Sequence, residues 1–239
     1  MKISLLQSRV ILVTGAGTGL GRAAAQAFAA QGATVLLLGR TEERLNEVYD
    51  LIIEAGHPTP AVFPFDLSAA DEAGFEGLAH TIAQQLGRLD GILHSAGRFM
   101  PLGPLSGQHL SQWLPVFATN LFAPFALTRS CLPLLYAAPD ASVLFTAEEH
   151  GLHPAALWGG FGISQGALVN MVQVFAAECT LPHVRFNILV PGAVASPMRV
   201  RTHPGEVNRS QRDPQELMDA YCYWMGSESR GRNGEVVRA

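Results

Sequence analysis

Lysine is almost missing from this sequence of 239 residues. Lys2 is the only lysine, and the other fifteen of the 16 basic residues are arginines. Because the guanidinium group of arginine does not lose its proton in proteins, it cannot replace a lysine whose pKa is lowered by burial. Any mechanism that depends on a buried, titrating lysine is therefore excluded from the core of this chain.

Cysteine, net charge and long apolar runs are also scarce. Cys131, Cys179 and Cys222 have no metal-ligand spacing, so we expect reduced core thiols in a cytoplasmic protein and no metal site. The formal net charge is −4 and no run of Lys or Arg occurs, which argues against a nucleic-acid partner. No signal peptide is expected before the first apolar run at Val10, and no stretch reaches membrane-spanning length, so we expect no membrane partner.

Short apolar runs alternate with amphipathic segments along the whole chain. The apolar runs are expected to be strands: Val10–Val13, Thr34–Leu38, Ala61–Phe65, Gly91–Leu93, Val143–Phe145 and Phe186–Val190. The amphipathic segments are expected to be helices: Leu20–Gln31, Thr41 as N-cap through Glu54, Ala70–Leu86, Gln112–Tyr136 and Gly162–Glu178. Strands without a polar face are typical of a parallel sheet covered on both sides. The expected fold class is α/β, a doubly wound parallel sheet (Rossmann fold) in three α/β/α layers, with residues 1–239 as a single domain.

The stretch VTGAGTGLGR lies between the first expected strand and the first expected helix. Its glycines, Gly15, Gly19 and Gly21, allow a tight turn and a close approach of the backbone to a pyrophosphate. Free N–H groups at the start of the helix then point at the anion. In this strand–loop–helix context, the spacing predicts a dinucleotide-binding site.

The end of the second expected strand, LLLGR, indicates which dinucleotide is bound. A carboxylate that pairs with the ribose 2′-hydroxyl is expected about 20 residues past the glycines. Gly39 occupies that place and Arg40 follows it. Because a guanidinium group suits a 2′-phosphate, we expect NADP(H) as the cofactor in preference to NAD(H).

With these motifs in order, nearly the whole chain resembles the short-chain dehydrogenase/reductase superfamily. The resemblance is carried by TGxxxGxG at Thr14–Gly21, FDLS with Asp66, HSAG at His94–Gly97, TNLF with Asn120, and VPGAVASPM. It implies a cofactor site formed by Gly15, Thr18, Gly19, Leu20, Gly21, Arg40, Asp66, Leu67, Ser95, Ala96, Gly97, Asn120, Pro191, Gly192, Val194 and Ser196. It also implies an oxidoreductase.

The same resemblance implies a catalytic set of Asn, Ser, Tyr and Lys, of which only Asn120 is retained. Alignment on the flanking glycines places Glu148 at the Ser position, Phe161 at the Tyr position and Gln165 at the Lys position. In the family, the Tyr passes a proton during hydride transfer, the Lys lowers its pKa and the Ser holds the substrate oxygen. None of the four tyrosines has a lysine four residues on, so we expect a divergent member without the YxxxK pair.

These replacements change the chemistry that is expected at the site. Phe161 cannot exchange a proton, and the neutral Gln165 cannot stabilise a phenolate. An ionised Glu148 would repel a developing alkoxide, so it can assist only when protonated, a form that burial against Phe161 would favour. His150 and His153 follow in the same loop, and each is a candidate acid or base.

The resemblance has consequences for the helices and for the assembly. The helix over Gln112–Tyr136 is expected to be disrupted at Asn120, because Pro124 has no N–H to donate to the Asn120 carbonyl. That helix and Gly162–Glu178 are expected to pair with other copies, giving a homo-oligomer, either a dimer or a tetramer. A polar segment with proline and glycine, about residues 197–212, is expected to form a short surface loop over the site.

Three interpretations of function remain open. The preferred one is an NADP(H)-binding oxidoreductase that acts on a carbonyl or alcohol substrate and takes its proton from Glu148 or a nearby histidine. The second is a catalytically inactive dinucleotide-binding protein, such as a sensor or a partner subunit. The third is a lyase or isomerase that uses Glu148 as a base. The expected ligand is a small molecule, and the fold class does not name it.

Overall fold

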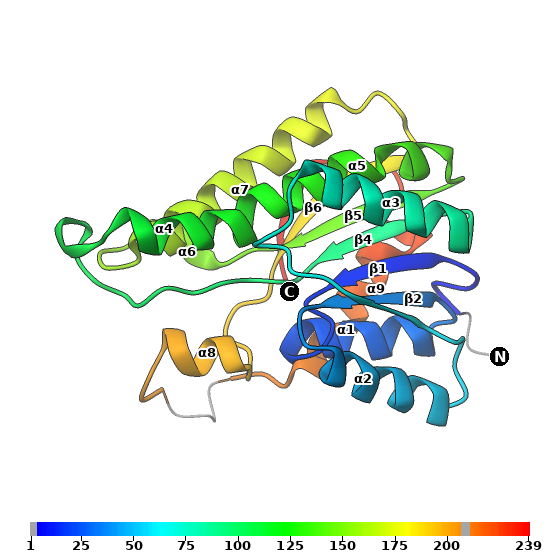
Figure 1. The fold of residues 1–239 in the computed structure, drawn as a ribbon, viewed down its shortest axis with the longest axis horizontal. Coiled ribbons are helices and arrows are strands. Elements are labelled where there is room, and N and C mark those ends of the chain that lie inside the picture. Colours follow the sequence, from blue (N-terminus) through cyan, green and yellow to red (C-terminus); the bar gives the residue numbers. More distant parts are fainter. Residues whose placement is uncertain (1–3, 207–210) are drawn as a thin grey trace.

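The computed structural model describes residues 4–206 and 211–239, in which seven strands form one parallel sheet. The order across the sheet is β3-β2-β1-β4-β5-β6-β7 (Figure 1). The strands are β1 Val10–Thr14, β2 Thr34–Gly39, β3 Ala61–Pro64, β4 Gly91–His94, β5 Ala141–Thr146, β6 Val184–Val190 and β7 Val236–Arg238. The order reverses between β1 and β4, as in a doubly wound sheet.

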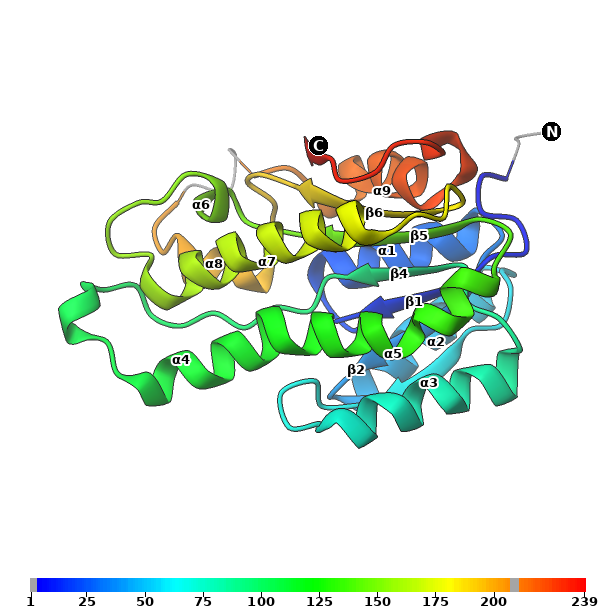
Figure 2. The same cartoon turned by 90° about the horizontal axis from the view of Figure 1, so that it is seen from above.

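Helices cover both faces of this sheet. They are α1 Gly19–Ala30, α2 Glu42–Glu54, α3 Glu72–Leu86, α4 Leu110–Phe117, α5 Ala123–Ala137, α6 Glu149–Leu152, α7 Gly159–Glu178, α8 Pro197–Thr202 and α9 Met218–Met225. Figure 1 and Figure 2 place α1, α2 and α9 on one face and α3, α5 and α7 on the other. The expected three-layer α/β/α fold is therefore confirmed. In the described part of the chain, no helix is long and apolar enough to cross a membrane.

Strand residues pack alternately into the two helix layers. In β1, Val10 and Leu12 belong to the core beneath α3, α5 and α7. Ile11 and Val13 belong to the core beneath α1, α2 and α9. Because each central strand is buried on both faces, its sequence shows no polar alternation. This double burial explains why apolar runs alone predict the strands.

The helix expected over Gln112–Tyr136 is interrupted. The structure has α4, then a π-helical turn at Ala118–Phe122, and then α5. Pro124 has no N–H to donate one turn back to Asn120, so the chain cannot continue a regular α-helix through this point. The disruption lies at Asn120, as the sequence predicts.

The prediction of a loop over 197–212 is wrong for its first part. Pro197–Thr202 form α8, because Ser196 caps the helix by accepting a hydrogen bond from the Arg199 N–H at 3.1 Å. Residues 207–210 of that segment lie outside the described residues. Strand β7 is not predicted either, because three residues are too few to give a periodic pattern. Thr41 occupies the N-cap position of α2 but makes no side-chain capping bond.

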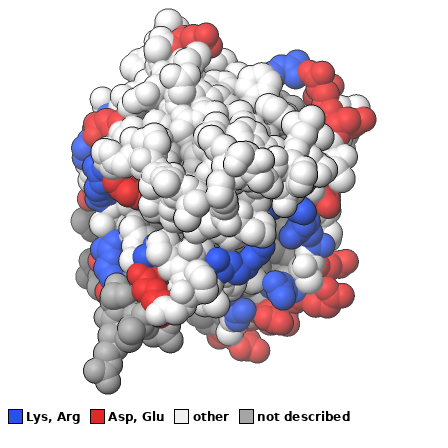
Figure 3. Space-filling view, turned by 90° about the vertical axis from the view of Figure 1, so that its left-hand side faces the viewer, with Lys and Arg blue, Asp and Glu red and all other residues white. Residues whose placement is uncertain are grey.

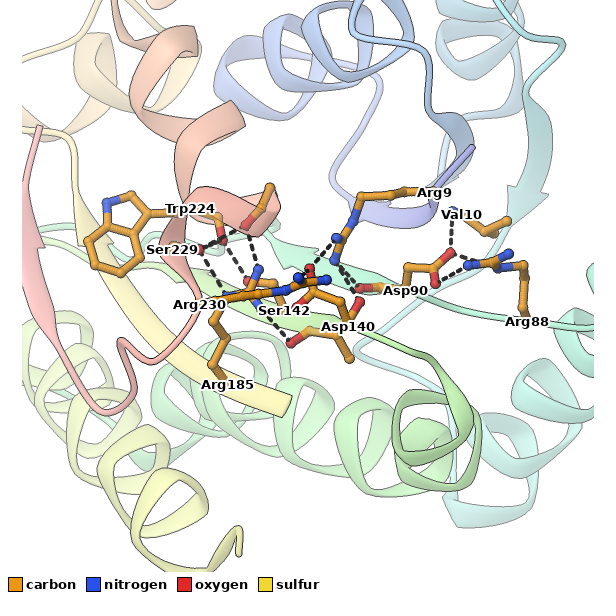
Figure 4. Close-up of polar contacts among 12 residues, drawn as sticks. Arg9, Val10, Arg88, Asp90, Asp140, Ser142, Arg185, Trp224, Ser229 and Arg230 are labelled. Atoms are coloured by element: carbon orange, nitrogen blue, oxygen red, sulfur yellow. Dashed lines mark hydrogen bonds and ion pairs between the residues drawn. The ribbon is translucent and has the colours of Figure 1, made fainter. Parts of the chain in front are cut away.

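A buried charged cluster joins the amino ends of the strands (Figure 4). Asp140, just before β5, lies 2.7 Å from Arg9 and 2.5 Å from Arg185. Arg230 approaches the same carboxylate at 3.3 Å. Arg185 also donates to the Ser229 hydroxyl at 2.9 Å. The cluster therefore ties β1, β5 and β6 to the C-terminal segment, at the edge of the sheet opposite the carboxyl ends of the strands.

Candidate active site

A cleft of about 680 Å³ lies where the carboxyl ends of the strands meet, at the reversal of strand order between β1 and β4. This is the place where doubly wound folds bind ligands. The cleft is lined by every cofactor-binding and catalytic position that the resemblance implies: Gly15, Thr18, Gly19, Leu20, Gly21, Arg40, Asp66, Leu67, Ser95, Ala96, Gly97, Asn120, Glu148, Phe161, Gln165, Pro191, Gly192, Val194 and Ser196. Folding thus brings these separate motifs together in one cleft.

The glycine loop is shaped by backbone contacts that a larger residue would block. Gly15 has a φ of +69°, and a Cβ there would lie 2.9 Å from the Ala96 Cα. A Cβ on Gly21 would overlap the Gly15 carbonyl oxygen. The Thr14 hydroxyl accepts a hydrogen bond from the Ser95 N–H at 3.0 Å, which fixes the loop against the end of β4. Since α1 has neither a capping side chain nor an acidic residue in its first turn, its N–H groups can receive an anion.

Two arginines line the cleft beside the glycine loop. Arg40 follows β2, and Arg44 lies one helical turn later at the start of α2. A Cβ on Gly17 would lie 3.0 Å from the Arg44 Cβ, so the Arg44 stem packs directly against the loop. The sequence analysis missed Arg44, and no helical spacing could have found it, because Arg40 lies before the N-cap Thr41 and outside α2.

Asp66 lies at the far wall of the cleft after β3. Its Oδ1 accepts hydrogen bonds from the Ser68 N–H at 2.9 Å and from the Ser68 hydroxyl at 2.7 Å. The hydroxyl bond is the largest influence on the pKa of Asp66 and lowers it, and the charges of Arg40 and Arg98 lower it further. Asp66 is therefore an anion with a fixed orientation at neutral pH.

His94 ends β4 beneath the cleft and is fully buried. Its Nε2 lies 2.9 Å from the Thr128 hydroxyl, and its ring stacks on Phe145 with the centroids 4.5 Å apart. Burial lowers the pKa of His94 to about 3, so the imidazole is neutral. His94 therefore supports the loop that follows it and does not exchange protons near neutral pH.

Asn120 is buried in the π-helical turn, where its side chain connects two walls of the cleft. Its Oδ1 accepts from the Arg98 N–H at 2.7 Å, and its Nδ2 donates to the Arg98 carbonyl at 3.0 Å. The Nδ2 group also donates to the Ser164 hydroxyl at 3.1 Å, which in turn donates to the Phe161 carbonyl at 2.7 Å. Asn120 therefore holds the loop after β4 against α7. Ser164 has no sequence signal that would have revealed this role.

The three positions at which the sequence analysis expects replacements lie close together on one wall. The Gln165 Oε1 accepts a hydrogen bond from the Glu148 N–H at 3.1 Å. A Cβ on Gly151 would lie 2.7 Å from the Gln165 Cβ, so α6 and α7 cross with backbone nearly touching backbone. This close crossing fixes the position of Glu148 relative to α7, which also carries Phe161.

Glu148 forms a hydrogen-bonded pair with His150. Its Oε2 accepts from the His150 N–H at 2.6 Å and lies 2.8 Å from the His150 Nδ1. The His150 ring stacks on Trp158 with the centroids 3.5 Å apart. The expectation that Glu148 is buried against Phe161 is wrong. The Glu148 side chain remains 25% exposed and contacts His150 instead. Glu148 lines both the main cleft and an adjoining pocket of about 280 Å³, which His150 and His203 also line.

Phe161 belongs to a small cluster of buried hydrophobic side chains. It is 3% exposed, and its ring meets Phe99 edge-on with the centroids 5.2 Å apart. Trp158 lies on its other side at 6.0 Å. Phe161 therefore contributes an apolar surface to the cleft at the position where the resemblance expects a hydroxyl.

The second candidate histidine, His153, lies outside the cleft. Its side chain is 69% exposed, 3.3 Å from Glu149 and 3.0 Å from the Arg238 guanidinium. It is not placed to exchange a proton with a ligand in the cleft. In residues 4–206 and 211–239, no three His, Cys, Asp or Glu side chains are grouped as metal ligands.

Helix α8 contributes cleft residues that the sequence analysis missed, namely Met198, Arg199 and Arg201. The Arg199 guanidinium is bound by both Glu206 carboxylate oxygens at 2.6 and 2.7 Å. Arg201 instead lies over the Phe99 ring, 5.8 Å from its centre. Figure 3 shows basic side chains gathered across the middle of this end of the molecule, below a broad area without charge. Because the contact of Arg201 with Phe99 joins segments far apart in the sequence, no local pattern reveals it.

Comparisons with known proteins agree with this geometry. The family described as short chain dehydrogenase matches residues 9–206. The uncharacterised oxidoreductase YciK of Escherichia coli K12 is 39% identical over 238 residues, which cover 100% of this chain and 94% of its own. A short chain dehydrogenase from Shigella flexneri 2a, complexed with NADP, has a TM-score of 0.96 at 38% identity and covers 99% of each chain. One from Escherichia coli CFT073, complexed with NADPH, has a TM-score of 0.96 at 38% identity, covering 100% of this chain and 99% of that one. This chain therefore belongs to the short-chain dehydrogenase family.

Proposed function

We propose that this chain is an NADP(H)-dependent oxidoreductase that interconverts a small carbonyl compound and its alcohol, with residues 1–239 as one catalytic domain. The N–H groups of the glycine loop and α1 would hold the pyrophosphate, and Arg40 with Arg44 would hold the 2′-phosphate. Gly39 leaves no carboxylate at the end of β2 to pair with the 2′-hydroxyl of NAD(H). The solved relatives from Shigella flexneri and Escherichia coli bind NADP and NADPH, which supports the same choice here.

The remaining predicted residues would hold the rest of the cofactor. Asp66 and Leu67 would face the adenine, and Ser95–Gly97 would support the middle of the molecule. The nicotinamide side would be formed by Pro191, Gly192, Val194 and Ser196. When bound, the nicotinamide supplies or accepts the hydride, while the protein supplies binding, orientation and the proton.

The observation that carries the proposal is the Glu148–His150 pair, whose carboxylate and imidazole lie 2.8 Å apart on the wall of the cleft. In carbonyl reduction, the substrate carbon gains a hydride with its electron pair, and the π electrons of the carbonyl bond move to the oxygen. The His150 imidazolium passes its Nδ1 proton to the Glu148 carboxylate, and the carboxyl group so formed gives that proton to the substrate oxygen. Solvent in the adjoining pocket then reprotonates His150. Alcohol oxidation follows the reverse order.

Phe161 and Gln165 would have supporting roles in this reaction. The Gln165 amide holds the Glu148 backbone at 3.1 Å, and the buried Phe161 ring keeps water from the substrate carbon. Asn120 fixes the loop after β4 from the opposite side. Proton transfer from a positioned side chain accelerates a reaction by a factor of roughly 10²–10⁴. The single carboxyl–imidazole pair would supply an acceleration of this size to the reductase.

The test compares Glu148→Gln with the matched control Glu149→Gln, which removes the adjacent carboxylate that bonds Arg238 instead. NADPH and NADH affinities are titrated first, and NADPH oxidation is then followed on a panel of carbonyl compounds. We expect Glu148→Gln to lower kcat by roughly 10²–10⁴ with unchanged NADPH affinity, and the control to stay near the wild type. Tight NADPH binding without turnover on any compound would refute the reductase and favour the inactive dinucleotide-binding protein. Equal kcat in both variants would show that Glu148 is not the acid.

We infer in addition that the protein forms a homo-oligomer, with its long helices at the interface. Four exposed apolar residues follow one another along α4, the π-helical turn and the start of α5: Leu110, Leu114, Phe122 and Phe125, which are 71%, 57%, 56% and 46% exposed. A row of exposed apolar side chains of this kind is typical of an association surface. Light scattering of the purified protein measures whether the particle is a dimer, a tetramer or, against the inference, a monomer.

A further inference from the structure

The Arg201 side chain on α8 lines the cleft. Its neighbour on α8, Arg199, is held by both oxygens of Glu206. In the described ranges, no carboxylate lies within ion-pair distance of Arg201, whose guanidinium rests 5.8 Å above the Phe99 ring. Arg201 is an exposed residue, and the ring lies beside its guanidinium group, so the N–H donors of that group remain open to an anion.

Different chemical groups follow one another along the wall of the cleft, starting from Arg201. The Phe99 ring lies next, and the Phe161 ring follows it at 5.2 Å. The Gln165 amide lies one helical turn after Phe161 on α7, and its oxygen accepts a hydrogen bond from the Glu148 N–H at 3.1 Å. The wall therefore changes from a cation, through two aromatic rings, to an amide and a carboxyl group that is paired with an imidazole.

We propose that the substrate is an apolar carbonyl or hydroxyl compound that carries a carboxylate at the end remote from the reacting carbon. Arg201 binds the carboxylate, Phe99 and Phe161 cover the apolar body, and the oxygen to be reduced meets Glu148. A compound with its carboxylate next to the carbonyl, such as a 2-oxo acid, is disfavoured, because its negative charge would lie against Glu148. This assignment rests on the proposed function for the reacting end only, since the carboxylate site can be tested by binding alone.

The experiment measures binding by calorimetry, with the protein saturated with NADP⁺ and also without cofactor. The probes are a para-acetylphenyl alkanoate, its methyl ester and an aryl 2-oxo acid. Arg201→Gln removes the proposed anchor. Arg129→Gln is the matched control, because this exposed arginine on α5 pairs with Glu72 and does not line the cleft.

The wild type and the control should bind the remote carboxylate roughly 10–100-fold more tightly than its ester or the 2-oxo acid. Arg201→Gln should reduce this preference to about onefold while leaving ester affinity unchanged. Equal binding of acid and ester by the wild type, or a preference that survives in Arg201→Gln, would overturn the inference, as would failure of all probes to bind. A preference that requires Arg201, in a protein that oxidises no NADPH with any carbonyl, would support the carboxylate site and refute only the proposed reaction.

Discussion

Replacing Asp140 by Asn tests whether the buried charged cluster holds the sheet together. The Asp140 side chain is 4% exposed, and two arginines that contact it, Arg9 and Arg185, have side chains that are 10% and 3% exposed. An amide at this position would remove the negative charge and leave both guanidinium groups buried. The third partner, Arg230, is 62% exposed and can turn towards solvent.

The size of the effect follows from the burial of these partners. Breaking a buried ion pair by removing one partner costs about 3–5 kcal/mol, because the remaining charge stays buried without compensation. For a domain of this size, each kcal/mol lowers Tm by roughly 2–4 °C, so Asp140→Asn should lower Tm by roughly 6–20 °C. The control is Arg129→Gln at the exposed pair with Glu72, where the expected loss is about 0–1 kcal/mol.

The assay is denaturant and thermal unfolding of both variants between pH 3 and pH 8. Burial by itself would raise the pKa of Asp140, but hydrogen bonds from Arg9 and Arg185 outweigh it and hold the pKa below its usual value. Since the folded pKa lies below the unfolded one, the stabilisation is complete above about pH 4 and is lost as pH falls through the folded pKa. The difference between wild type and Asp140→Asn should therefore shrink only at the acid end.

A loss no larger than that of the Arg129→Gln control at pH 7 would refute this reasoning. If Asp140→Asn does not fold, Arg230→Gln provides a milder version, because this exposed arginine contacts the same carboxylate at 3.3 Å. The NADPH affinity of the folded variant should be unchanged, because the cluster lies at the edge of the sheet opposite the cleft. A changed affinity would show that the two edges are coupled.

Two further predictions concern the cleft. Arg40→Ala should weaken NADPH binding roughly 10–100-fold and leave NADH binding nearly unchanged, because it removes a charged partner of the 2′-phosphate only; calorimetric titration with both nucleotides checks this, and equal losses would contradict it. The combined change Glu148→Ser, Phe161→Tyr and Gln165→Lys should raise kcat for NADPH oxidation roughly 10²–10⁴-fold above Glu148→Gln alone, since it rebuilds the family's proton donor. No gain would show that the pocket does not present a carbonyl substrate to α7.

The parts of the fold that the sequence predicts are those fixed by neighbouring residues. In β1, alternate side chains enter different cores, so an uninterrupted apolar run is sufficient evidence of a buried strand. Gly15 and Gly19 have φ of +69° and +53°, values that residues with a Cβ rarely adopt, and Gly87 ends α3 at +69°. Such local requirements leave a direct trace in the sequence.

The parts that the sequence does not predict depend on contacts between distant residues. His150 and His153 cannot be told apart by pattern, and the stacking of the His150 ring on Trp158, a contact with a more distant residue, helps to hold it beside Glu148. Arg201 reaches the Phe99 ring from a helix about one hundred residues later in the chain. The structure of residues 197–202 is also not evident from the sequence. The polar composition of this segment favours a loop, but Ser196 caps the segment and it forms a helix.

The crossing of α6 and α7 explains how the proton donor can change helices without leaving the site. A Cβ on Gly151 would lie 2.7 Å from the Gln165 carbonyl carbon, so the two backbones approach more closely than a residue with a side chain at position 151 would permit. A carboxyl group at the start of α6 and a hydroxyl on α7 at position 161 would therefore reach the same part of the cleft. Glu148→Gln removes the donor from α6, and the combined change restores it on α7. If both variants behave as predicted, the proton donor has moved from α7 to α6 with the replacement of the Tyr–Lys pair, while the scaffold has stayed the same.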